Sequence, residues 1–151
     1  MALAAVAWFV GSDESRTSSS ESRRQVIRAA LEWALIDENV PDHALLPDPT
    51  NILISLDDLS FEELPLLPGI TLAALTEQEL QDKADQDGSL MRLSLTNLQI
   101  SGSKASVRVS NMWLSPSNES SGFLSGGYCD LELREKDGRW AFERRISCAI
   151  A

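Results

Sequence analysis

Basic residues are scarce in this sequence, and their scarcity narrows the classes of partner. The 151 residues include 13 Lys and Arg against 23 Asp and Glu, which gives a formal net charge of −10. A phosphate backbone or an anionic membrane surface repels such a chain unless its few basic residues cluster tightly. We therefore expect no nucleic-acid partner for this acidic protein.

Histidine is almost absent, and the common catalytic motifs are missing. His43 is the only histidine, so it cannot form a metal site or a catalytic triad by itself. No G-x-S-x-G, H-E-x-x-H or paired C-x-x-C pattern occurs. Residues 85–88 are similar to part of a calcium-binding loop, but Lys83 and Ser94 occupy the positions that need Asp and Glu. The sequence therefore identifies no metal site, no cofactor and no catalytic residue, and it leaves open whether the protein is an enzyme.

The N-terminus also has no apolar run long enough to cross a membrane. Residues 2–10 are apolar but number only nine, and no basic residues precede them, so they can neither span a bilayer nor form a complete signal peptide. Two interpretations are open: the segment packs on the domain or a neighbour, or it is the remnant of an anchor or export signal. The protein is accordingly cytoplasmic or exported, with a membrane partner only in the second case. We assign residues 1–22 to this segment and a Ser-rich linker, and residues 23–151 to one domain.

The region after the Ser-rich linker predicts two helices and a short strand. A capping box at Ser22 and apolar residues at helical spacing predict an amphipathic helix over residues 21–37. The apolar residues 52–54 indicate a buried strand. The second helix has the clearest signals, because Thr76 is an N-cap within a capping box and Gly88 follows as a stop.

From Leu90 onward the hydrophobic pattern has a period of two, which is typical of strands. The phase shifts near residues 96–97, which predicts a bulge there. A hairpin ends the chain, with strands at residues 127–136 and 139–150 and a type I′ turn at Asp137-Gly138. The order of elements predicts an α+β domain, in which two or three N-terminal helices pack on one face of a curved antiparallel sheet of four long strands plus a short strand.

The hairpin turn fixes a register that bears on the cysteines. Counted residue by residue from the turn, this register makes Arg144 the one charged residue on an otherwise apolar face. It places Cys129 and Cys148 diagonally, about 7–8 Å apart, whereas a disulfide needs Cα atoms within about 7 Å. We therefore expect free, buried thiols, unless a bulge at residues 126–127 shifts the register.

Three side chains are candidates for binding a ligand. The guanidinium of Arg144, on a concave sheet surface, could hold a carboxylate, although such an arginine more often extends to solvent or pairs with a structural acid. Asn111 and Trp113 share one side of a strand with apolar residues. An amide and an indole on an apolar sheet face are typical of a small-molecule pocket.

The order of elements, the strand that begins Gly126-Gly127-Tyr128 and the turn Asp137-Gly138-Arg139-Trp140 resemble the nuclear-transport-factor-like superfamily, with its ketosteroid-isomerase-like and SnoaL-like proteins. The resemblance covers roughly residues 21–150 in layout, and residues 128–147 in recognisable sequence. It implies a cone-shaped sheet wrapped around helices, with a pocket between them and frequent dimers. The enzymes of the superfamily carry an acid or base, often Asp, with Tyr or His inside the cone, but no such set aligns with this chain.

Three functional hypotheses follow. The first is a non-enzymatic domain that binds a small apolar ligand or a protein partner. The second is a small isomerase, cyclase or hydrolase that uses a carboxylate in the pocket, with Arg144, Asn111 and Trp113 orienting the substrate. The third is an interaction module that forms a homodimer through its sheet and has no pocket.

Overall fold

The computed structural model describes residues 13–119 and 126–150, and it has an α+β fold built on one six-stranded sheet. The elements in chain order are α1 (Asp13–Leu31), a π-helical segment (Glu32–Ile36), β1 (Asn51–Ser55), β2 (Thr71–Leu75), α2 (Glu77–Asp87), β3 (Leu90–Ser101), β4 (Lys104–Leu114), β5 (Gly126–Lys136) and β6 (Arg139–Ile150), with 3-10 turns at His43–Leu45 and Phe61–Glu63. The predictions for residues 1–12 lie outside the described residues.

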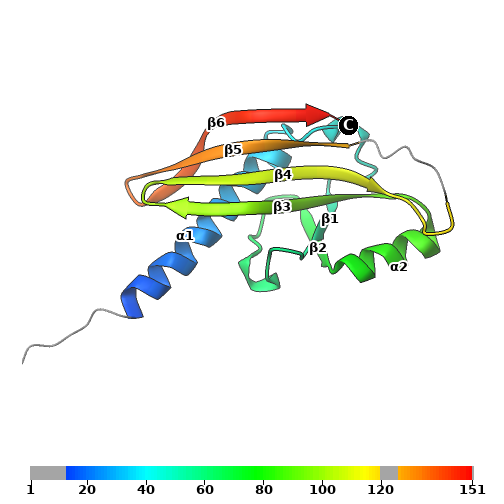
Figure 1. Ribbon diagram of the computed structural model, residues 1–151, viewed down its shortest axis with the longest axis horizontal. Coiled ribbons are helices and arrows are strands. Elements are labelled where there is room, and N and C mark those ends of the chain that lie inside the picture. The colour runs from blue at the N-terminus through cyan, green and yellow to red at the C-terminus, as the bar shows by residue number, and fades with distance from the viewer. Residues whose placement is uncertain (1–12, 120–125, 151) are drawn as a thin grey trace, which may run out of the picture.

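The sheet combines antiparallel and parallel pairing in the order β2-β1-β3-β4-β5-β6. The four long strands β3 to β6 are antiparallel neighbours, as predicted, and the bulge after Thr96 is confirmed. β1 is also confirmed, but β2 was not predicted and pairs with β1 in parallel. Figure 1 shows the long strands side by side with α1 running across them, and the sheet is neither closed nor strongly curled.

Local sequence signals predicted the bounds of α2 but not the start of α1. α2 is confirmed from end to end, because the Thr76 hydroxyl accepts a hydrogen bond from the Glu79 N–H and Gly88 caps the C-terminus at a φ of 93°. α1 begins at Asp13, before the expected start, so the capping box predicted at Ser22 is wrong. Serine is only mildly unfavourable within a helix, and the packing of the following apolar turns stabilises the extended helix.

The helices pack on opposite faces of the sheet, so the prediction of a single helical face is wrong. α1 packs its apolar residues in a cluster with Leu93 and its neighbours. α2 contributes Leu80 and Ala84 to a second cluster with Leu90. Leu90 and Leu93 are three residues apart on one strand, so their side chains point to opposite faces. We call the face under α1 the inner face and the opposite one the outer face.

The C-terminal hairpin has the predicted turn but not the predicted register throughout. The pairing agrees from the turn as far as Phe142, and then two bulges insert Glu143 and Ile146 into β6. Each bulge adds one unpaired residue to its strand. Cys129 and Cys148 consequently lie directly opposite each other with Cα atoms 4.1 Å apart, and they form a disulfide. The prediction of two free thiols is wrong, because it assumed an unbroken register.

Candidate functional site

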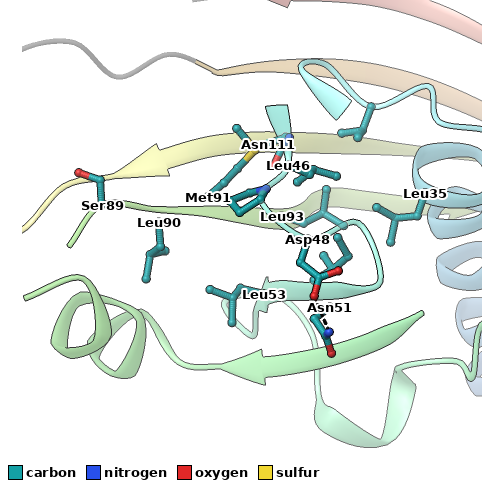
Figure 2. A pocket seen from close by; sticks show the side chains of 13 residues that line it. Leu35, Leu46, Asp48, Asn51, Leu53, Ser89, Leu90, Met91, Leu93 and Asn111 are labelled. Carbon is teal, nitrogen blue, oxygen red and sulfur yellow. Dashed lines mark hydrogen bonds between the residues drawn. The ribbon is translucent and has the colours of Figure 1, made fainter. Parts of the chain in front are cut away.

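A cavity of about 210 Å³ lies where β1 and β3 separate (Figure 2). These two parallel strands are paired only at Ile54 and Leu93. On the N-terminal side of that pair the strands separate, and Figure 2 shows Leu53 and Leu90 extending into the space between them. The cavity therefore exists because a parallel ladder is one residue pair long.

The lining of the cavity is apolar in its buried part and polar at its mouth. Its buried residues are Leu35, Val40, Ile52, Leu90, Met91, Leu93 and Asn111. The exposed lining residues Pro47, Asp48, Asn51 and Ser89 mark the mouth, and Leu46 and Leu53 are half-buried. An apolar cavity with very few polar groups is the usual form of a small-molecule site.

Asn111 is the polar side chain in the buried part of this lining. It lies on the inner face of β4 between Leu93 and Gly127, with an exposed fraction of 1%. Its Nδ2 donates a hydrogen bond of 3.0 Å to the carbonyl oxygen of Pro41. Its Oδ1 accepts no hydrogen bond from any described residue. A buried acceptor without a partner costs about 1–3 kcal/mol, so the amide of Asn111 carries an uncompensated penalty.

The position of Asn111 depends on a glycine on the neighbouring strand. A Cβ atom at Gly127 would lie 2.9 Å from Cβ of Pro41 and 2.6 Å from the carbonyl oxygen of Ala149. The missing side chain lets Pro41 lie against β5, within reach of the Asn111 amide. Gly127 and Pro41 therefore fix which edge of that amide is left without a partner.

Asp48 is the charged residue among the described lining residues. Its carboxylate accepts hydrogen bonds from the Thr50 hydroxyl at 2.6 Å, the Thr50 N–H at 2.9 Å and the Asn51 amide at 2.8 Å. These bonds lower the pKa of Asp48 to about 2, and the bonds from the Thr50 and Asn51 side chains contribute most. The mouth of the cavity consequently carries a negative charge at neutral pH.

The structure brings the three predicted ligand-binding residues to different places. Asn111 lines the cavity, whereas Trp113 is half-buried two residues further along β4, paired with Met91 and outside the lining. Arg144 lies opposite Glu132 and forms an ion pair with it, and its side chain is 67% exposed. The prediction that Arg144 interrupts the apolar face is wrong, because the bulge at Glu143 turns it to the outer face. Ligand binding by these residues stays a prediction.

Sequence reasoning missed most of the cavity. Asp48 lies between two prolines, and Asp followed by Thr50 and Asn51 is a recognisable Asx-turn pattern, but that pattern does not indicate a cavity. The residues of β1 were identified as buried, but their separation from β3 has no local signal. Two strands that are distant in the chain must be placed together before a gap between them can be predicted.

The outer face of the sheet carries a second group of polar residues, and these are paired with one another. Arg108 donates two hydrogen bonds, of 2.8 and 3.0 Å, to the Asp130 carboxylate, and it lies 3.9 Å from the centre of the Tyr128 ring. Ser147 donates a further bond of 3.0 Å to Asp130. The bond from Arg108 is the main cause that lowers the pKa of Asp130. This cluster has the character of a structural network.

The described part of the chain has neither a metal-binding cluster nor a helix that could span a membrane. No group of three or more His, Cys, Asp or Glu side chains in residues 13–119 and 126–150 is placed to hold a metal ion. In the same ranges, no helix has the length and apolar character needed to span a membrane. In comparisons with known proteins, no protein-family model, curated protein or solved structure matched the chain.

Proposed function

We propose that this protein is a non-enzymatic domain that binds a small apolar or amphipathic molecule in the cavity between β1 and β3. The observation that carries the proposal is the unpaired Oδ1 of Asn111 in an otherwise apolar lining. A cavity with one oriented polar group can select a ligand by shape and by one hydrogen bond.

The size of the cavity limits the ligand. An apolar cavity of about 150 Å³ accommodates benzene, and pockets for drug-sized molecules measure about 300–1,000 Å³. At about 210 Å³, this cavity fits a single ring or a short chain. We therefore propose a ligand of roughly ten non-hydrogen atoms or fewer.

The chemistry of Asp48 favours binding over the alternative of a carboxylate-dependent isomerase, cyclase or hydrolase. A general acid or base works best with a pKa near the operating pH. The pKa of Asp48 is instead lowered to about 2 by its hydrogen bonds. It is also exposed at the mouth rather than buried in the cavity.

A distant relation to the nuclear-transport-factor-like superfamily is part of the proposal. The α+β order of elements and the hairpin that closes the chain support it. A cone-shaped sheet would need stronger curvature than the open sheet described above.

The proposal is tested by a fragment screen followed by NMR. Fragments of one ring should shift the amide signals of Leu93 and Asn111. A Leu53→Phe variant fills the cavity and should abolish these shifts, whereas Leu66→Phe should keep them, because Leu66 is 92% exposed and outside the lining. The proposal is wrong if no fragment affects the lining residues, or if Leu53→Phe binds as well as the unmodified protein.

A further inference from the structure

We propose that the cavity selects neutral ligands that donate a hydrogen bond, such as a phenol, an alcohol or a primary amide, and that it discriminates against carboxylates. This inference rests on the proposed function and specifies its ligand class. It follows from the orientation of one amide and from the charges around the cavity.

One edge of the Asn111 amide has a hydrogen-bond partner and the other has none. Nδ2 is held by the carbonyl oxygen of Pro41, which does not belong to the cavity lining. A flipped amide would bring Oδ1 against that carbonyl and would place two acceptors together. Oδ1 therefore points away from Pro41 and is the edge that lacks a partner. An amide oxygen only accepts hydrogen bonds, so its natural partner is a hydroxyl or N–H group.

The charges around the cavity disfavour an anionic ligand. No Lys, Arg or His belongs to the lining formed by the described residues, and Asp48 at the mouth is ionised. A carboxylate ligand would lose its hydration without gaining a cation or a donor, and such burial is strongly unfavourable. The chain as a whole, with a net charge of −10, adds to the repulsion.

The depth of Asn111 disfavours a cationic donor. Asn111 is buried, and the mouth is formed by exposed residues. A ligand that reaches Oδ1 must place its polar group in the buried part and its apolar body against Leu53, Leu90 and Met91. A charged ammonium at that depth would also lose its hydration, so the favoured donor is neutral.

The test compares four one-ring probes by NMR titration at pH 7: phenol, toluene, anisole and benzoate. Phenol donates a hydrogen bond, toluene has the same shape without a polar group, anisole keeps the oxygen but cannot donate, and benzoate is anionic. We expect phenol to bind at least about fivefold more tightly than toluene and anisole, since a hydrogen bond contributes about 1 kcal/mol. Benzoate should bind more weakly than toluene.

An Asn111→Leu variant provides the second arm. The preference for phenol over toluene should fall by at least about fivefold in this variant, because the acceptor is gone. The four probes also test the inference on the unmodified protein, so the conclusion does not depend on the folding of the variant.

The outcomes separate the two proposals. If none of the neutral probes binds, the proposed function itself fails. If toluene binds but phenol has no advantage over anisole, or if benzoate binds as tightly as phenol, the ligand class is wrong and the binding function stands. An unchanged phenol preference in folded Asn111→Leu also overturns the ligand class.

Discussion

On β4, Arg108 lies on the outer face of the sheet and Asn111 lies on the inner face, three residues further along. Arg108 has its charge paired with Asp130 through two hydrogen bonds. Asn111 uses only one edge of its amide, and the other edge is buried without a partner. Polar residues that form hydrogen bonds with each other contribute to the fold. A buried acceptor without a hydrogen-bond partner is instead a feature that a binding site would use.

Arg134 on the outer face also has a buried atom without a partner, but its setting differs. Nε of Arg134 is buried without a hydrogen bond. It lies 3.8 Å from a carboxylate oxygen of Glu143, so a charge of opposite sign is close. Asn111 is neutral and has no such compensation, and this makes the inner face the better candidate for a ligand.

The largest loss of stability should come from removing the disulfide between β5 and β6. A Cys129→Ala/Cys148→Ala double variant should lose about 2–3 kcal/mol of unfolding free energy, since the cross-link closes a short loop in the unfolded chain. Urea denaturation measures the loss, and phenol affinity should be unchanged because neither cysteine lines the cavity. Rapid reaction of the native protein with a thiol reagent, without reductant, would contradict the disulfide itself.

The next largest effect should come from Gly127→Ala, which acts on the inner face alone. The new Cβ would collide with Pro41 and with the carbonyl of Ala149, and overpacking of this kind costs about 1–3 kcal/mol. Displacement of Pro41 should also free the Asn111 amide and weaken phenol binding. Ala141→Val, at an exposed position of β6, is the matched control and should change neither quantity. Equal stability of Gly127→Ala and the unmodified protein would show that Pro41 does not lie against this glycine.

Helix α2 and the disulfide show where prediction from the sequence succeeds and where it fails. α2 was predictable because all its signals are local, from the capping box at Thr76 to Gly88. The disulfide was not, because it depends on the bulges at Glu143 and Ile146, which have no sequence signature.

The candidate site was also predictable only in part. Asn111 was found because alternation along β4 places it on the apolar face. The cavity around it was not found, because it depends on a ladder of one residue pair between β1 and β3, two strands that are distant in the chain.

A smaller effect is expected for Asp130→Asn on the outer face. The pair with Arg108 is partly exposed to solvent, so its loss should cost about 1 kcal/mol or less. The pKa of Asp130 is lowered in the folded state, mainly by the bond from Arg108. Its contribution to stability is therefore present above the unfolded value of 3.8 and is lost as the pH falls through the lower folded value. Unfolding curves between pH 2 and pH 6 should show a weaker acid dependence in the variant than in the unmodified protein. A steeper acid dependence in the variant would contradict the stabilising role of the Asp130 carboxylate.

The smallest effect on stability should come from Asn111→Leu, although its effect on binding is the one that matters most. The substitution removes a buried acceptor without a partner, which is favourable, and it deprives the Pro41 carbonyl of its donor, which is unfavourable. These terms have similar size, so the unfolding free energy should change by less than about 1 kcal/mol. Asp130→Asn should show the opposite combination, with lower stability and unchanged phenol binding. If Asn111→Leu instead unfolds the protein as strongly as Gly127→Ala, the amide is a structural bond to the Pro41 loop. Asn111 on the inner face and Arg108 on the outer face would then both serve mainly to stabilise the fold.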